Sequence, residues 1–413
     1  MKKRIVSLVL MAMLLGGCSA DVPEETTPTE SQPQIQEQTG ISVQKVEGLP
    51  EDFIMGADVS SLIAQENSGV IYRDFEGHEQ ELVKILADAG LNYIRVRVWN
   101  DPYDAQGNGY GGGNCDLNTA LAIGKRATEN GMQLLVDFHY SDFWADPGKQ
   151  QAPKAWEGMT LEQKKDAIAE YTRSSLQTLQ DAGVAVGMVQ IGNETTGGMC
   201  GEWTAEGQYT LMAEAAAAVR QLDRDILIAV HYTNPERGGY AGFAQKLKDY
   251  HVDYDVFASS YYPAYHGTLN NLIAQLRSVA NGYGKKVMIA ETAWDNKTYD
   301  ASEKGAYPYS VQGQATALRD LIEAMNSLGE QALGVFYWEP AWIEVPGSSW
   351  EERSQIWEQY GSGWASSFAG EYDPQDAGKY YGGSACTKQA WFDEQGYPLE
   401  SLLTFQYVRN GKN

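Results

Sequence analysis

The chain has 413 residues and a formal net charge of −24 at neutral pH. This acidic balance argues against nucleic acid or an anionic membrane surface as a partner, and it favours a neutral polymer over a strongly acidic one. Apart from Cys18, the cysteines are Cys115, Cys200 and Cys386, and three thiols allow at most one internal disulfide. The sequence leaves open whether Cys115 and Cys200 form it. No two have the spacing of metal ligands, so we expect no zinc site.

The N-terminus is typical of a bacterial lipoprotein signal. A basic start at residues 1–4 precedes an apolar run over residues 5–15. The run is too short to cross a bilayer as a helix, which needs about 20 residues. It ends at Leu15-Gly16-Gly17-Cys18, which resembles the lipobox. We therefore expect residues 1–17 to be a signal peptide and Cys18 to carry the lipid, although an ordinary signal with a chance cysteine is the alternative.

The rest of the chain divides by composition. Residues 18–49 are rich in Glu, Thr, Pro, Gln and Ser and offer little to bury, so they predict a flexible tether. Residues 50–407 form one catalytic domain, and residues 408–413 form a C-terminal tail. We expect a monomer held at the cell surface, outside the cytoplasm, that meets the membrane only through the lipid at Cys18.

The catalytic region alternates strand-like runs with amphipathic helical stretches. One stretch has apolar residues at Leu82, Ile85, Leu86 and Ala89 and ends at Gly90. Eight strands separated by helices predict an α/β fold, a (β/α)8 TIM barrel, whose active site lies at the C-terminal ends of the strands. The predicted strands are 53–58, 93–99, 133–139, 188–192, 226–231, 256–261, 286–291 and 333–338.

Two glutamates lie where predicted strands end. Glu194 follows the fourth strand and Glu291 ends the seventh, so a barrel brings both carboxylates to one face. Either alone could be structural, but a carboxylate pair across a cleft is what cleavage of a glycosidic bond requires. Asn193, beside the acid, could hydrogen-bond a sugar hydroxyl. We therefore predict Glu194 and Glu291 as the catalytic pair.

Other polar residues at strand ends are candidates for binding the substrate or supporting the acids. Arg95 and Arg97 alternate with valines, so both point to one face of their strand. We expect Arg97 to pair with a catalytic carboxylate, whereas a buried structural ion pair is the alternative. Asp58, His139 and His231 lie at other strand ends, and the two histidines could equally be satisfied core residues.

Aromatic residues near the predicted loops are candidates for stacking on sugar faces. Rings with a polar tip suit a wet cleft better than a dry core. Most aromatics in a barrel are core residues, so each has a structural alternative, and Trp338 is the best placed because it ends the eighth strand. The candidates are Trp99, Trp144, Tyr261, Tyr262, Trp338 and Trp342.

A series of motifs in chain order resembles family 53 glycoside hydrolases, the endo-β-1,4-galactanases. The motifs are GADVSS (56–61), RVRVWNDP (95–102), GYGGGN (109–114), DFHYSDFWADP (137–147), QIGNE (190–194), SSYYP (259–263), AET (290–292) and YWEPAW (337–342). The resemblance implies a barrel of the retaining clan with Glu194 as acid/base and Glu291 as nucleophile. It also implies β-1,4-galactan, a neutral side chain of pectin, as the substrate.

The sequence departs from the resemblance at one loop. Bacterial members often carry a calcium-binding loop after the seventh strand, whereas residues 295–304 here are shorter and lack its pattern. Calcium needs six to eight oxygen ligands. The sequence therefore leaves a structural calcium open, with Asp295, Asp300, Ser367 and Asp373 as possible ligands, and predicts no cofactor for catalysis.

These residues predict a double displacement. Glu194 needs a raised pKa and Glu291 a lowered one, for which we expect Arg97 to be responsible. The carboxyl groups of a retaining pair lie about 5–5.5 Å apart. Two alternatives remain: an endo-glycanase acting on mannan, xylan or β-glucan, and a non-catalytic lipoprotein that captures oligosaccharides. A Glu194→Gln substitution would abolish turnover by an enzyme but leave the affinity of a binding protein nearly intact.

Overall fold

The computed structural model describes residues 40–298, 300, 302–379, 381–383 and 386–413. Eight parallel strands follow one another in chain order and close into a barrel, so the predicted (β/α)8 fold is confirmed. β4 begins two residues earlier than predicted, and β7 continues for one residue more. The strands are β1 (Ile54–Asp58), β2 (Tyr93–Val98), β3 (Gln133–Phe138), β4 (Val186–Ile191), β5 (Leu227–Tyr232), β6 (Val256–Ser260), β7 (Lys286–Thr292) and β8 (Ala332–Trp338).

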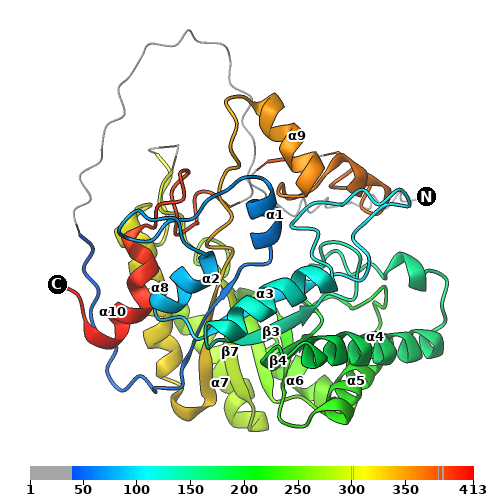
Figure 1. Ribbon diagram of the computed structural model, residues 1–413. Helices are drawn as coiled ribbons and strands as arrows, with labels where there is room; N and C mark the ends of the chain where they lie inside the picture. Colours follow the sequence, from blue (N-terminus) through cyan, green and yellow to red (C-terminus); the bar gives the residue numbers. More distant parts are fainter. Residues whose placement is uncertain (1–39, 299, 301, 380, 384–385) are drawn as a thin grey trace, which may run out of the picture.

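Helices surround the strands, and α9 stands clear of them at the top of the view in Figure 1. The helices are α1 (Leu62–Asn67), α2 (Leu82–Asp88), α3 (Leu117–Glu129), α4 (Leu161–Asp181), α5 (Ala205–Leu222), α6 (Tyr240–Asp249), α7 (Leu269–Tyr283), α8 (Val311–Asn326), α9 (Trp350–Tyr360) and α10 (Thr404–Asn410). Short 3₁₀ helices are η1 (Lys154–Trp156), η2 (Pro235–Arg237), η3 (Gly329–Gln331), η4 (Ser367–Glu371) and η5 (Glu400–Leu403).

Local sequence signals set the ends of several helices. At α4, the Thr160 side chain accepts from the backbone of Gln163, and the Gln163 side chain accepts from the backbone of Thr160, which is a capping box. The predicted end of α2 is confirmed, because Gly90 follows it with a φ of 91°. Such left-handed backbone is open to glycine at little cost.

Apolar side chains fill both the inside of the barrel and the layer under the helices. Ile54, Tyr93, Leu135, Met188 and Phe336 belong to the inner cluster, which is separate from the outer core. Every second residue of a strand points inward, so polar residues near the strand ends stand directly on this packed interior. The active site therefore has a rigid apolar floor.

The folded domain begins earlier and ends later than predicted. Ile41, Val43 and Val46, expected in the flexible tether, are buried. Val43 forms an antiparallel bridge with Lys412, which was expected in a C-terminal tail. The two ends pack together because each supplies buried apolar side chains. The polar composition of the neighbouring tether makes those at the N-terminal end hard to recognise from the sequence. The predicted signal peptide, Cys18 and the tether up to residue 39 lie outside the described residues.

Within the described part of the chain, none of the helices has the length and apolar character needed to cross a membrane.

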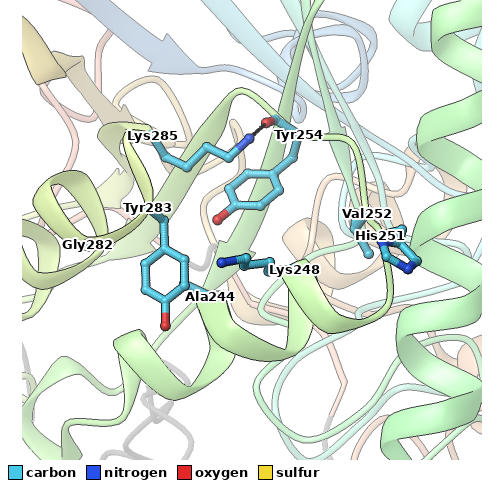
Figure 2. Close-up of a pocket in the computed structure, with 8 residues that line it drawn as sticks. All are labelled: Ala244, Lys248, His251, Val252, Tyr254, Gly282, Tyr283 and Lys285. Atoms are coloured by element: carbon cyan, nitrogen blue, oxygen red, sulfur yellow. Dashed lines mark hydrogen bonds between the residues drawn. The ribbon is translucent and has the colours of Figure 1, made fainter.

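A hollow of about 450 Å³ opens between α6 and α7 near the N-terminal ends of β6 and β7. In Figure 2 the Lys285 ammonium reaches the backbone carbonyl of Tyr254, and the side chains of Lys248 and Tyr283 lie nearby. The Tyr254 hydroxyl is itself buried without a partner among the described residues. None of the predicted site residues lines this hollow, which lies at the opposite end of the strands from Glu194 and Glu291.

Candidate active site

Glu194 lies three residues beyond β4 in a turn of unusual backbone. Its φ is 45°, a left-handed conformation that is uncommon for a residue with a side chain and often marks a functional position. The Ser260 hydroxyl donates a 2.6 Å hydrogen bond to Glu194 Oε1, and the Glu194 backbone N–H donates to His231 Nδ1 at 3.3 Å. The turn therefore presents a largely buried carboxyl group held by neighbouring strand ends.

Glu291 reaches the same region through an irregularity in β7. Ile289 pairs with Ser259 and Glu291 pairs with Ser260, so β7 carries one extra residue. Met288 and Ala290 both belong to the inner cluster, and strict alternation would send Glu291 outward. The extra residue re-aims the side chain, as bulges near active sites do. As a result, Glu291 Oε1 lies 2.9 Å from the Arg95 guanidinium.

The two carboxyl groups have different electrostatic surroundings. Burial and the neighbouring charge of Glu291 raise the pKa of Glu194 to about 8, against a smaller lowering by Ser260. Burial also raises the pKa of Glu291, opposed chiefly by Arg95. The prediction of a lowered pKa at Glu291 is therefore wrong, because desolvation outweighs the guanidinium. Glu291 still ionises first, since the cation contacts it directly.

Arg95 links the acid pair to the barrel rim. Its guanidinium is buried and lies 2.8 Å from a carboxylate oxygen of Asp58 and 2.8 Å from one of Asp137. It also donates to Asn193 Oδ1 at 3.0 Å. A buried cation among three carboxylates is well paired, and removing it would leave uncompensated charge. Asp58 and Asn193, two of the predicted site residues, thus hold Arg95 in place.

Arg97 does not contact Glu291, contrary to the prediction. It pairs with Glu339 at 2.6 Å, donates to the Gly112 carbonyl at 2.6 Å, and lies 4.4 Å from the centre of a Trp144 ring. Arg97 is two residues after Arg95 on β2 and therefore lies nearer the rim, where Glu339 follows the end of β8. The Glu339 pKa is raised to about 7 by burial, against the lowering effect of Arg97.

Both predicted histidines are buried at the rim. The Trp99 indole N–H donates to His139 Nδ1 at 3.0 Å, so the neutral ring carries its proton on Nε2, 3.1 Å from Asp137. His231 Nδ1 accepts the Glu194 backbone N–H and lies 3.0 Å from the Gln190 amide nitrogen as well as 2.9 Å from Asn193 Oδ1. With two N–H donors directed at Nδ1, the proton lies on Nε2, 2.9 Å from the Ser260 hydroxyl. Burial lowers the pKa of His231 well below its usual range. His231 therefore stays neutral and orients Ser260 toward Glu194.

The aromatic candidates separate into two groups. Tyr262 donates its hydroxyl proton to Glu291 Oε2 at 2.9 Å, which places it in the site. Trp99 and Trp342 are fully buried and Tyr261 is 3% exposed, so these three rings have no face open to a sugar in this structure. Trp338 is only partly buried. Of the buried rings, Trp99 and Trp342 pack against Trp144.

Trp144 and Trp338 form the open aromatic surface. Their rings lie 6.3 Å apart, and Trp144 also stacks on the buried Trp342 at 6.2 Å and 19°. The Arg97 guanidinium lies against the Trp144 ring. A cation under an indole holds the ring in place through its π face, so this surface has a fixed orientation.

Sequence reasoning did not identify Gln190 and Ser260 as site residues. Gln190 Nε2 donates to Asp137 Oδ1 at 2.5 Å and lies 3.0 Å from His231 Nδ1. The sequence feature that could have identified Gln190 is a single amide side chain between two apolar residues of β4. Ser260 lies beside Ser259 in the sequence, and only the barrel shows that one hydroxyl points to Glu194 and the other to Tyr240.

The cysteines and the possible calcium ligands are not brought together as sites. Cys115 and Cys200 are buried free thiols. Among the described residues no group of His, Cys, Asp and Glu could hold a metal ion. Three of the possible ligands have other contacts: Asp300 accepts from Ser302, Ser367 donates to Glu358, and Asp373 pairs with Lys149. Burial raises the pKa of the fourth, Asp295, to about 6. A structural calcium at these residues stays a prediction.

Comparison with known proteins gives consistent results. The model of glycosyl hydrolase family 53 matches residues 54–405. An endo-beta-1,4-galactanase of Bacillus subtilis (strain 168) is 52% identical, covering 100% of this chain and 99% of that protein. An arabinogalactan endo-beta-1,4-galactanase of Cellvibrio japonicus is 34% identical over 73% of this chain and 86% of its own length.

Solved structures show the same relationship. The GH53 catalytic domain of Ignisphaera aggregans has a TM-score of 0.79 and 35% identity, covering 89% of this chain and 99% of that one. A native xylanase of Cellvibrio japonicus, 13% identical with a TM-score of 0.54 over 89% of this chain and 74% of that one, shares the fold alone.

Proposed function

The chain belongs to glycosyl hydrolase family 53, and from this premise we propose that it is an endo-β-1,4-galactanase. The names of the relatives from Bacillus subtilis and Cellvibrio japonicus support galactan as the substrate. The observation that carries the proposal is the pair of rim carboxyl groups, one held by a hydroxyl and the other by a guanidinium. A neutral polymer also suits a chain of net charge −24.

The proposed reaction is a double displacement by Glu194 and Glu291. With a pKa of about 8, Glu194 is protonated at neutral pH and can donate to the glycosidic oxygen. Glu291, which ionises first beside Arg95, attacks the anomeric carbon and forms a covalent galactosyl-enzyme. Ionised Glu194 then takes a proton from a water molecule whose oxygen attacks the anomeric carbon and displaces Glu291, so the product leaves with retained configuration.

The surrounding residues support these two roles. Arg95 is paired with Asp58 and Asp137 as well as with Glu291. The two aspartates hold the guanidinium in place beside Glu291. Tyr262 donates to Glu291 Oε2 and Arg95 contacts Oε1, so both partners fix the orientation of the carboxylate. Neutral His231 cannot compete with Glu194 as a proton donor, and its Nε2–H keeps the Ser260 hydroxyl aimed at the acid.

The first experiment is reducing-sugar release from β-1,4-galactan, with mannan, xylan and β-glucan in parallel. We expect activity on galactan and none in a Glu291→Ala variant. The anomer formed first, followed by NMR, distinguishes retention from inversion. Activity on another glycan alone would overturn the substrate, and an initial α-anomer would overturn the double displacement. A wild type that binds galactan without cleaving it would be the sugar-capturing protein.

We also propose that the enzyme is anchored to the cell surface by a lipid at Cys18. The support is the sequence Leu15-Gly16-Gly17-Cys18 after a short apolar run. In cells, a Cys18→Ser variant should leave the membrane fraction or accumulate unprocessed, whereas wild type should sediment with membranes. Wild type released into the medium at mature size under inhibited lipoprotein processing would contradict the anchor.

A further inference from the structure

Trp203 is an exposed tryptophan in the loop that carries the acid/base. The loop runs from the end of β4 to the start of α5, and Trp203 is 55% exposed. An exposed indole offers a flat apolar face on which a ligand can pack. Sequence reasoning did not select it, because no strand ends beside it.

The loop holds Trp203 rigidly. Met199 and Glu202 exchange backbone hydrogen bonds of 2.9 and 2.8 Å, which close a tight turn just before the tryptophan. The Lys164 ammonium of α4 pairs with Glu202 at 2.7 Å and donates to the Cys200 carbonyl at 3.1 Å. A ring mounted on such a turn loses little conformational entropy when a ligand packs on it.

One side of the ring rests on glycine backbone. A Cβ atom at Gly198 would lie 3.0 Å from the Trp203 ring, and one at Gly197 would lie 3.6 Å from it. A side chain at Gly198 would crowd the ring, whereas one at Gly197 would meet it at ordinary contact distance. Gly197 is three residues from Glu194, and three residues of chain span at most about 11 Å. The open side of Trp203 therefore lies within a few sugar units of the acid/base.

The position of the loop defines which part of the substrate it meets. Gly197 approaches the Pro147 carbonyl, so the loop leans toward the segment after β3. Glu291 lies on β7, which pairs with β6 and β8 on the other side of the barrel. Trp203 is thus beyond Glu194 as seen from Glu291. In the proposed mechanism the leaving sugar extends in that direction, since the acid protonates its oxygen.

We infer that Trp203 forms a stacking platform for a sugar of the leaving-group side of the polysaccharide. The inference rests on the proposed function and adds a substrate-contacting residue to it. The flat apolar ring packs against the C–H face of a galactose unit.

The test compares two substrates that differ only in the leaving group. On galactan, the leaving group is a sugar chain that reaches Trp203; on β-1,4-galactotriosyl fluoride, it is a fluoride ion that does not. We expect Trp203→Ala to lower kcat/KM on galactan about tenfold and to leave the fluoride reaction unchanged. Trp203→Phe should restore part of the loss.

Trp350→Ala is the matched control, because Trp350 is 50% exposed but is carried by α9. It should leave both reactions unchanged. An unchanged galactan rate in Trp203→Ala, or an equal loss on both substrates, would overturn the inference. An equal loss together with a shifted basic limb of the pH profile would mean that Trp203 supports Glu194 only. A wild type inactive on galactan would instead refute the proposed function, and the glycan that it does cleave would replace galactan in the comparison.

Discussion

Arg95 and Arg97 make a natural comparison, because they lie on the same strand, point to the same side and are both buried. Arg95 joins Asp58, Asp137 and Glu291, at the chemical centre of the site. Arg97 pairs with Glu339 and lies against the Trp144 ring, which is part of the open aromatic surface. Two equivalent cations thus have different partners: one contacts the carboxylate proposed as the nucleophile, and the other holds a tryptophan ring.

The two carboxylates that these arginines contact show the same division. Glu291 and Glu339 are both buried glutamates whose pKa is raised by desolvation and lowered by an arginine. Glu291 also accepts from Tyr262, which leaves it facing the region of Glu194. Glu339 accepts from the backbone and hydroxyl of Ser61 and is fully buried, whereas Glu291 keeps 7% exposure. Access from the cleft therefore differs between the two acids, although both have arginine partners.

The largest expected effect comes from removing each of these glutamates. Glu291→Ala should lower kcat by at least about 10⁴-fold, because no other group can attack the anomeric carbon. Glu339→Ala should raise KM and retain measurable kcat. Steady-state kinetics on galactan measures both. Added azide should restore turnover to Glu291→Ala alone, with an inverted galactosyl azide as product, and restoration in Glu339→Ala would contradict the division of roles.

The arginines should differ in stability as well as in activity. Arg95→Met leaves three carboxylates without their cation and should lower the free energy of unfolding by about 3–5 kcal/mol. Arg97→Met leaves mainly Glu339 uncompensated and should cost less. Urea unfolding of both variants at one pH measures the difference. Equal losses of stability would mean that the partners of Arg95 depend on their cation no more than Glu339 depends on Arg97. The Arg95→Lys variant tests whether a positive charge without the guanidinium shape is sufficient.

Glu194 should make the stability of the protein depend on pH. Its folded pKa of about 8 lies above the ordinary value of 4.5. The contribution of Glu194 to the free energy of unfolding is therefore fully present below about pH 4.5. It is lost as the pH rises to about 8, where Glu194 ionises in the folded protein as well. Glu194→Gln should be more stable than wild type by ~2 kcal/mol at pH 8 and equal to it near pH 4.5.

Thermal unfolding across this pH range checks the prediction, with Glu129→Gln, an exposed glutamate at the end of α3, as the control. A constant difference between Glu194→Gln and wild type at all pH values would contradict it.

The smallest expected effect concerns Ser260. Its donated hydrogen bond favours the ionised form of Glu194, so Ser260→Ala should raise the pKa of Glu194 further. The basic limb of kcat/KM should then move upward by ~0.5–1 pH unit. Ser259→Ala is the matched control, because the neighbouring hydroxyl bonds to Tyr240 on the other side of β6. An unmoved limb in Ser260→Ala would exclude this hydrogen bond as a determinant.

The barrel and the position of both glutamates at one rim could be predicted from the sequence, because alternating strand and helix patterns and carboxylates at strand ends are local features. The start of the domain could not. Residues 40–49 resemble the polar tether in composition, and only the bridge between Val43 and Lys412 shows that they are packed. The burial of Trp99 and Trp342 was also hidden, since an aromatic near a loop gives no sign of which rings will cover it.

By itself, the sequence determined the strand order, the rim on which the polar residues gather and the two acids that face each other across it. The tertiary structure alone decided how these groups pair. One extra residue in β7 turns Glu291 toward Arg95 and leaves Arg97 to Glu339. The physical reason is that strand periodicity is a property of one segment, whereas a buried charge takes its partner and its pKa from whatever distant segments close around it.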